Sequence, residues 1–240
     1  MSALLSVAGV SKRFRGLVAV DRASFEVARG EIFAVIGPNG AGKTTLFSII
    51  AGALKPNEGE IAFQGERIDG LRPDQICRRG IARTFQIVRP FPALTVEDNV
   101  IIGALLRTSD TARARATAHD VLRQLDLFDK RTRAAKSLTL PDRKRLEVAR
   151  ALATAPQLLL LDEVMAGLRP TETDRIVAIL RELNAQGLTI LLIEHVMRAV
   201  MALANRVLVL HHGAPIALGS PADVVREPAV ISSYLGAEAL

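Results

Sequence analysis

The segment 37–45 carries the strongest chemical signal in the chain. It reads GPNGAGKTT, which fits the pattern G-x-x-x-x-G-K-[ST]. Glycines let a backbone fold closely around phosphates, a lysine neutralises their charge, and a threonine hydroxyl can bind Mg²⁺. A nucleotide with ATP-like phosphates and Mg²⁺ are therefore the expected cofactors. The predicted phosphate loop consists of Gly37, Pro38, Asn39, Gly40, Ala41, Gly42, Lys43, Thr44 and Thr45.

Two acids follow an apolar run farther along the chain. The sequence LLLLDE ends in Asp162 and Glu163. Alone, acids at a strand end are often there only for solvation. Beside a phosphate loop they gain roles, because Mg²⁺ bound to phosphates needs a carboxylate. We expect Asp162 to hold the metal, together with Thr44, and Glu163 to orient or deprotonate a water.

Two further polar residues are candidates for the site. One follows a predicted strand, and the other stands where the predicted core ends and the helical segment begins. His195 follows the apolar run in TILLIEHVM, and Gln86 ends the sequence ARTFQ. By themselves, such a histidine is more often structural and such a glutamine more often a surface residue. Ligands gather where parallel strands end, so we expect His195 to donate to the terminal phosphate. Gln86 is expected to reach the Mg²⁺ or the attacking water.

Strands and helices must hold these residues in place. The chain alternates short apolar runs with amphipathic periodicity, which predicts an α/β fold. We expect a P-loop NTPase core with a mostly parallel sheet. The expected buried strands are 31–36, 157–161, 188–193 and 206–210, and the expected core helices are 43–51 and 171–185. Strand-like runs at 4–10 and 17–27 have no helix between them, which predicts N-terminal antiparallel strands. A hairpin is expected to turn near Gly213.

The middle of the chain reads differently. Strand signals disappear between residues 86 and 155, and helices are expected at 95–106, 111–125 and 142–153. We therefore expect a single domain over residues 1–240. Its catalytic core comprises 1–85 and 156–240, with the antiparallel part and a C-terminal tail, and residues 86–155 form an inserted helical subdomain.

Composition excludes several classes of protein. The chain has 240 residues, 49% hydrophobic, a net charge of +6 and a single cysteine, Cys77. One cysteine allows no internal disulfide, and no apolar run approaches the roughly 18 residues of a membrane span. Together with an N-terminus unlike a signal peptide, this predicts a cytosolic protein. Aromatic residues make up only 4%, which gives base stacking little support, so no nucleic-acid partner is expected.

The order and spacing of these motifs resemble the ATPase subunit of ABC transporters. The matching residues are GPNGAGKTT, Gln86, LLLLDE, AGLRP and His195, and the resemblance covers nearly the whole chain. Three stretches look more specifically like the ATPases of branched-chain amino-acid importers. They are IARTFQIVRPFPALTVEDNV, LLIEHVMRAV and GSPADVVREPAVISSYLG.

The resemblance implies partners and further roles. It implies ATP hydrolysis by two cassettes packed head to tail, either two copies or this chain with a sister subunit. Transmembrane permease subunits, an external solute-binding protein and a peripheral position on the cytoplasmic side of the inner membrane are also implied. Phe14 falls where the family stacks an aromatic on adenine. Residues 166–169 match a loop between subunits, although Arg169 replaces the usual Asp or Asn.

The largest departure from the family lies in its signature loop, L-S-G-G-Q. The matching segment is LTLPD, residues 138–142, in which Thr139 keeps a hydroxyl for a γ-phosphate in the partner's site. Both glycines are gone, Pro141 removes a backbone donor, and the Asp142 carboxylate is expected to oppose phosphate. One alternative is therefore a nucleotide-binding partner whose sister subunit does most of the hydrolysis. A soluble ABC ATPase acting on nucleic acid, or a nucleotide kinase, are further alternatives.

Overall fold

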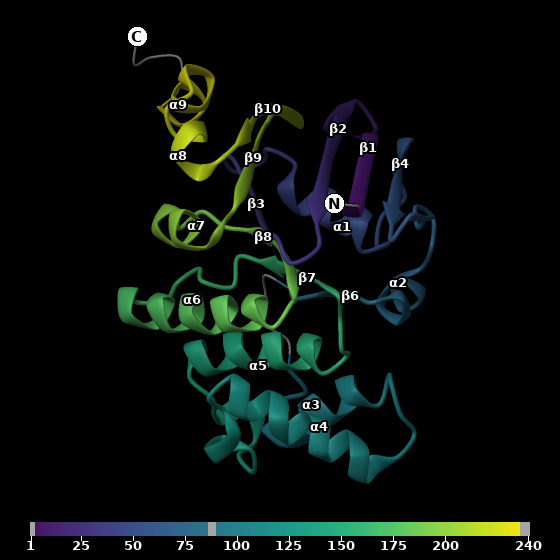
Figure 1. Ribbon diagram of the computed structural model, residues 1–240, viewed down its shortest axis with the longest axis vertical. Coiled ribbons are helices and arrows are strands. Elements are labelled where there is room, and N and C mark those ends of the chain that lie inside the picture. Colours follow the sequence, from purple (N-terminus) through teal and green to yellow (C-terminus); the bar gives the residue numbers. More distant parts are fainter. Residues whose placement is uncertain (1–2, 86–89, 236–240) are drawn as a thin grey trace.

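The computed structural model describes residues 3–85 and 90–235, which alternate strands and helices along the chain (Figure 1). Two short 3₁₀ helices span Phe128–Lys130 and Ala135–Ser137. The strands are β1 (Ala3–Phe14), β2 (Leu17–Ala28), β3 (Ile32–Ile36), β4 (Glu58–Phe63), β5 (Glu66–Arg67), β6 (Ile81–Arg83), β7 (Leu158–Asp162), β8 (Thr189–Ile193), β9 (Arg206–His211) and β10 (Ala214–Gly219). The helices are α1 (Lys43–Ile50), α2 (Pro73–Arg79), α3 (Val96–Ala104), α4 (Thr111–Gln124), α5 (Leu140–Leu152), α6 (Pro170–Ala185), α7 (Met197–Leu203), α8 (Pro221–Val224) and α9 (Pro228–Leu235).

A mostly parallel sheet forms the core, and it confirms the predicted fold class. Among the described residues its strand order is β10-β9-β3-β8-β7-β6, and only β10 runs antiparallel to its neighbour. Every residue of β3, β7 and β8 is buried, as expected for β-branched and leucine-rich strands covered on both faces. Val35 of β3 and Asp162 of β7 both pair with Ile193 of β8. The segments that follow these three strands therefore start at one edge of the sheet.

The N-terminal strands form a second, antiparallel sheet, also as predicted. Its order is β2-β1-β4-β5, and β1 pairs antiparallel with both β2 and β4. Helix α1 packs between the two sheets. Its residues Leu46 and Phe47 are fully buried in a cluster that includes Phe33 of β3 and Val7 of β1. The sheet thereby places the β1–β2 turn beside the segment that leads from β3 into α1.

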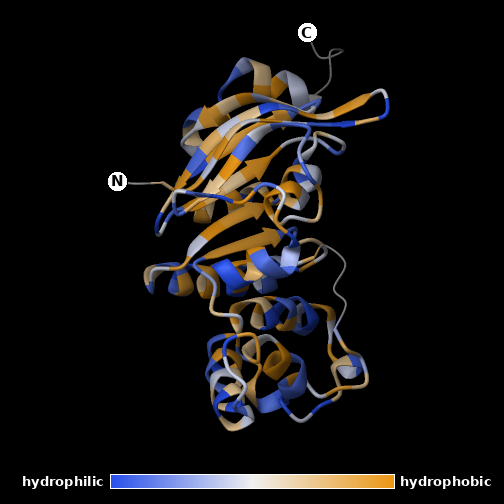
Figure 2. Ribbon diagram, turned by 90° about the vertical axis from the view of Figure 1, so that its right-hand side faces the viewer, coloured by the Kyte–Doolittle hydropathy of each residue, from blue (hydrophilic) through white to orange (hydrophobic). Residues whose placement is uncertain are grey.

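Helices α3, α4 and α5 pack together at the end of the molecule opposite β1 and β10 (Figure 1). Apolar residues on one face of each helix, including Val100, Leu122 and Leu146, are fully buried, and Figure 2 shows hydrophobic and hydrophilic residues alternating along these helices. Helix α5 also buries polar residues, among them Asp142 and Glu147. Caps fix where they start: the side chain of Thr95 accepts the N–H of Asp98, and that of Asp110 accepts the N–H of Ala112. Within the described ranges, no helix has the length and apolar character needed to cross a membrane.

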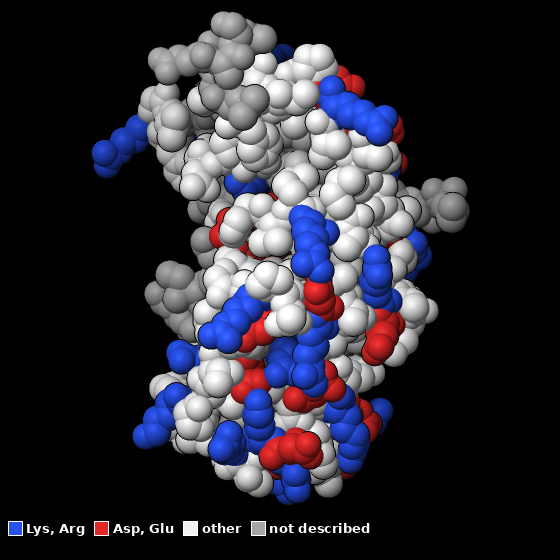
Figure 3. Space-filling model, turned by 90° about the vertical axis from the view of Figure 1, so that its left-hand side faces the viewer, with Lys and Arg blue, Asp and Glu red and all other residues white. Residues whose placement is uncertain are grey.

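Basic residues of the helical segment form ion pairs with nearby acids. Arg115 pairs with Glu97 at 2.8 Å, and Arg123 with Asp120 at 2.8 Å. Figure 3 shows Lys and Arg interleaved with Asp and Glu over the lower half of one face. This face is therefore a mixed surface rather than a purely basic one.

Candidate functional site

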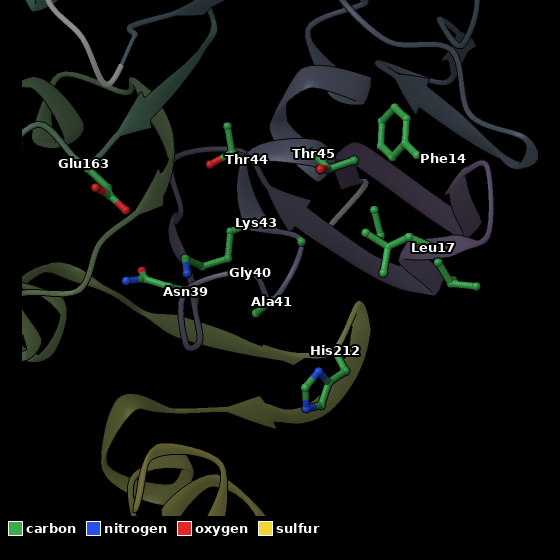
Figure 4. Close-up of a pocket in the computed structure, with 13 residues that line it drawn as sticks. Phe14, Leu17, Asn39, Gly40, Ala41, Lys43, Thr44, Thr45, Glu163 and His212 are labelled. Atoms are coloured by element: carbon green, nitrogen blue, oxygen red, sulfur yellow. The ribbon is translucent and has the colours of Figure 1, made fainter. Parts of the chain in front are cut away.

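The phosphate loop lines an open cavity of about 490 Å³ between the two sheets. β3 ends at Ile36, α1 begins at Lys43, and the loop between them wraps one side of the cavity. At one end lies Phe14 and at the other Glu163, with Lys43 between them (Figure 4). The residues that line the cavity are Phe14, Leu17, Val18, Ala19, Asn39, Gly40, Ala41, Gly42, Lys43, Thr44, Thr45, Glu163 and His212.

Two loop glycines are required by close approach of other backbone segments. Gly42 has φ +100°, and a Cβ on it would overlap the carbonyl oxygen of Ala19 in β2. Gly37 has φ +145°, and a Cβ there would overlap the carbonyl oxygen of Leu210 in β9. The loop is thus clamped between both sheets, and only glycine fits at either position.

Lys43 turns its ammonium group into the curve of the loop. Its Nζ donates hydrogen bonds to the carbonyl oxygens of Gly37 at 2.7 Å and Pro38 at 2.8 Å. Burial lowers the pKa of Lys43, while the nearby charges of Glu163 and Asp162 partly oppose this shift. A cation held this way, at the start of a helix, is placed to neutralise phosphate oxygens.

Asp162 ends β7 inside the protein, with 1% of its surface exposed. Its backbone N–H donates to Thr84 Oγ1 at 3.1 Å, and its Oδ2 accepts from Arg83 at 2.9 Å. Its Oδ1 is buried and has no hydrogen-bond partner among the described residues. A buried carboxylate oxygen of this kind calls for a further ligand, and it fits a hydrated Mg²⁺.

Glu163 sits in the left-handed backbone region, with φ +49°. Its N–H donates to the carbonyl oxygen of Ile193 at 3.0 Å, and its own carbonyl oxygen accepts from Lys144 Nζ at 3.0 Å. Non-glycine residues adopt this conformation only where surrounding contacts enforce it. The contacts with β8 and α5 therefore aim the Glu163 carboxylate into the cavity (Figure 4).

Two other predicted residues lie around the same cavity. His195 Nδ1 is 3.8 Å from Glu163 Oε2, and its side chain is about half exposed at the cavity's edge rather than in its lining. Phe14, at the far end, is partly exposed, with Lys12 Nζ 5.3 Å from the centre of its ring. The structure thus gathers Phe14, the loop, Asp162, Glu163 and His195 in one region. Gln86 lies outside the described residues.

Comparison with known proteins agrees with this geometry. The model of the ABC transporter family matches residues 20–166, more than half of the chain. The chain belongs to the ABC transporter family. A second model, described as "Branched-chain amino acid ATP-binding cassette transporter", matches residues 214–239. ATP is therefore the nucleotide, and the chain is an ATPase cassette.

Individual relatives match over nearly their whole length. LivG of Escherichia coli K12, a high-affinity branched-chain amino acid transport ATP-binding protein, is 41% identical over 97% of this chain and 98% of its own. BraF of Pseudomonas aeruginosa PAO1, with the same description, is 37% identical over equal shares. The structure of MJ1267, an ATP-binding cassette of an ABC transporter, in its ADP conformation superposes with a TM-score of 0.90. It is 31% identical and covers 98% of this chain and 100% of its own.

The signature loop of this ABC cassette lies apart from its own phosphate loop. Thr139 lines a separate cavity with Lys130 and Arg145, and its hydroxyl accepts the N–H of Asp142 at 3.4 Å as the cap of α5. This cap starts α5 at Leu140, two residues earlier than the sequence predicts. Within one chain, Thr139 is therefore not brought to the nucleotide cavity.

The expectation that the Asp142 carboxylate opposes phosphate needs correction. Asp142 is 3% exposed, and its two oxygens accept from Lys130 and Arg145. Burial alone would raise the pKa of Asp142, but hydrogen bonds from Lys130 and Thr139, with the charge of Arg145, outweigh it and lower the pKa. The carboxylate is turned inward and neutralised, so it adds little negative potential at the loop.

Asp142→Asn is expected to lower the free energy of unfolding by about 3 kcal/mol at pH 7, because two cations lose a buried partner. The pKa of Asp142 is lower in the folded protein than its ordinary value of 3.8. Its contribution is therefore complete above the ordinary pKa and is lost as pH falls through the folded pKa. Urea melts at a series of pH values should show the difference from wild type shrinking below about pH 4.

A matched control is Asp120→Asn, which breaks the exposed pair with Arg123. We expect it to cost less than about 1 kcal/mol. Equal losses for the two variants would show that burial of Asp142 adds nothing.

Several residues at the site were not predicted from the sequence. Arg83 holds Asp162, Lys144 holds the Glu163 carbonyl, and His212 lines the cavity from the β9–β10 turn. Glu194, buried next to His195, accepts the N–H of Met165 at 2.9 Å. None belongs to a local pattern that signals phosphate chemistry, and Arg83 and Lys144 reach the site through contacts distant in sequence.

Proposed function

We propose that this chain is the ATP-hydrolysing subunit of an ABC importer for small polar solutes, most directly branched-chain amino acids. The observation that carries the proposal is the cavity in which the Lys43 loop and the Glu163 carboxylate face each other. Such an arrangement can bind phosphates on one side and activate a water on the other.

Each residue around the cavity has a separate role in hydrolysis. Backbone N–H groups of the loop and the Lys43 ammonium group hold the β- and γ-phosphates, and Phe14 stacks on the adenine. Glu163 accepts a proton from the water that attacks the γ-phosphate, while His195 donates a hydrogen bond to that phosphate. Hydrolysis then depends on positioning and charge neutralisation rather than on a covalent intermediate with the protein.

Thr44 and Asp162 are the described residues that would hold Mg²⁺, and Gln86 is the third ligand predicted from the sequence. The free Oδ1 of Asp162 supports this assignment. When bound, Mg²⁺ neutralises the charge of the β- and γ-phosphate oxygens.

A second cassette would complete each site. Thr139 lies in a separate cavity from the phosphate loop. In a head-to-tail pair, the Thr139 loop of one subunit would meet the nucleotide held by the other. ATP would close such a pair, and hydrolysis would reopen it.

The helical segment 86–155 is proposed as the unit that contacts transmembrane permease subunits. It exposes large apolar side chains, including Phe91, Leu94, Ile102 and Leu105. Contact there would keep the cassette peripheral, on the cytoplasmic side of the inner membrane. In the full system, an external solute-binding protein would deliver the solute.

The solute class is supported by the similarity to LivG and BraF and by the match of residues 214–239. We expect a strain lacking this subunit to lose uptake of radiolabelled leucine and to regain it with the wild-type gene. Unchanged leucine uptake in the deletion strain, with loss of urea or short-amide uptake, would assign another solute.

The signature loop favours one alternative, in which a sister subunit does most of the hydrolysis. Pro141 removes a backbone donor where the family has a glycine. Turnover of Mg²⁺-ATP by the purified chain tests this point. Turnover by the chain alone would support a self-paired ATPase, whereas tight ATP binding without turnover would support the alternative.

A further inference from the structure

Arg83, at the end of β6, connects the β7 strand that carries Asp162 with the α1 helix that carries Thr44. Its side chain is 11% exposed and reaches two other elements. Nη2 donates to Asp162 Oδ2 at 2.9 Å, and Nη1 donates to Ser48 Oγ at 3.1 Å. The guanidinium group thus spans β7 and α1 in a single fork.

The contact with Ser48 continues to the phosphate loop. Ser48 Oγ donates to the carbonyl oxygen of Thr44 at 2.7 Å, one helical turn earlier in α1. Thr44 and Asp162 are the two described residues assigned to Mg²⁺. Arg83 is therefore linked to both, directly to Asp162 and through Ser48 to the backbone of Thr44.

The two oxygens of Asp162 have different surroundings as a result. Oδ2 is held by Arg83, whereas Oδ1 is buried and has no hydrogen-bond partner among the described residues. A buried carboxylate needs a nearby positive charge or hydrogen-bond donors to offset its desolvation. Arg83 supplies that charge, and its rigid fork fixes the rotation of the carboxylate.

We propose that Arg83 is a positioning residue that presents Asp162 to Mg²⁺ through Oδ1 alone and ties it to the helix carrying Thr44. The proposal rests on the assignment of Asp162 to Mg²⁺ in the proposed function. Groups that orient a metal ligand in this way typically change metal affinity by about 10–100-fold when they are replaced.

In a purely structural buried ion pair, we would expect the polar atoms of both side chains to have hydrogen-bond partners. Here Arg83 Nε and Asp162 Oδ1 are both buried without a hydrogen-bond partner in the described part of the chain. Leaving such groups unpaired costs free energy, and in native proteins an unpaired buried group points to a function or a missing ligand. The free Oδ1 of Asp162 is an acceptor that fits a hydrated cation.

The test measures metal dependence by binding rather than by turnover. The full chain binds a fluorescent ATP analogue while Mg²⁺ is raised from an EDTA baseline, which gives the Mg²⁺ midpoint of the affinity increase. Arg83→Gln is expected to raise this midpoint about tenfold. Losing the positive charge would by itself favour Mg²⁺, so the two effects oppose each other.

Arg83→Lys separates geometry from charge. Lysine keeps the charge but lacks the fork, so we expect a raised midpoint here as well, with affinity for the analogue in EDTA close to wild type. This variant leaves the buried charge balanced, and it carries the test if Arg83→Gln fails to fold. The control is Arg198→Gln. It removes an exposed ion pair in which Nη2 of Arg198 donates to both carboxylate oxygens of Asp174 at 2.7 Å, and it should leave the midpoint unchanged.

A wild-type midpoint in folded Arg83→Lys would overturn the proposal and leave Arg83 as a simple counter-charge. Asp162→Asn distinguishes this failure from failure of the proposed function. If Asp162→Asn retains the wild-type Mg²⁺ dependence, Asp162 is not a metal ligand and the premise is wrong. If it loses that dependence while Arg83→Lys keeps it, only the role of Arg83 is refuted.

Discussion

Glu163→Gln is expected to retain ATP binding and to slow ATP turnover by roughly 10²–10⁴, the usual effect of losing a general base. The amide keeps the size of the side chain, and the contacts that hold this residue at φ +49° come from its backbone. The cavity should therefore keep its shape while losing the proton acceptor. Phosphate release under saturating Mg²⁺-ATP and equilibrium binding of an ATP analogue measure the two effects separately.

Glu182→Gln is a suitable control, because it makes the same chemical change at an exposed residue of α6 that lines neither the nucleotide cavity nor the Thr139 cavity. It should keep wild-type turnover. Turnover within about threefold of wild type in Glu163→Gln would remove Glu163 from its role as base, since that loss is far below the range for general-base catalysis.

Gly42→Ala is expected to lower ATP affinity by about 100-fold, or about 2.8 kcal/mol. A left-handed conformation costs a non-glycine residue about 1–2 kcal/mol. In addition, the new Cβ would overlap the Ala19 carbonyl oxygen in β2. The loop must shift away from β2, and its N–H groups then no longer converge on the phosphates. Titration with a fluorescent ATP analogue measures the loss.

Gly219→Ala in β10 provides the comparison. A Cβ there meets its neighbours at 3.6 Å or more, and Gly219 has no positive φ. It should bind ATP like wild type, with thermal melts of both variants reporting whether the fold survives. Wild-type affinity in Gly42→Ala would mean that the loop can bind phosphates away from its contact with Ala19.

Replacement of the family glycines in the signature loop affects the local fold and the phosphate-binding groups differently. Thr139 and Pro141 still start α5 correctly, and Asp142 is neutralised by Lys130 and Arg145. The local fold thus tolerates the loss of both family glycines, and the carboxylate is no obstacle to phosphate. What remains changed is the missing backbone donor at Pro141, and turnover of Mg²⁺-ATP by the purified chain measures its effect on a self-paired cassette.

Much of the fold follows from local patterns. The apolar runs that became β3, β7 and β8 predicted buried parallel strands, because only strands covered on both faces lack polar positions. The absence of a helix before residue 31 predicted the antiparallel sheet. Short elements such as β6 and α2 were not predicted, since three to seven residues carry too little periodicity.

The sequence by itself determined the phosphate loop, the two acids at the end of the β7 strand and the family, because these chemistries need fixed residue types at fixed spacing. Only the tertiary structure decided which distant residues support them. Arg83 meets Asp162 across 79 positions of sequence, and the inward turn of Asp142 depends on Lys130, twelve residues away. Such pairings leave no periodic signal, because they depend on how strands and helices pack rather than on neighbours along the chain.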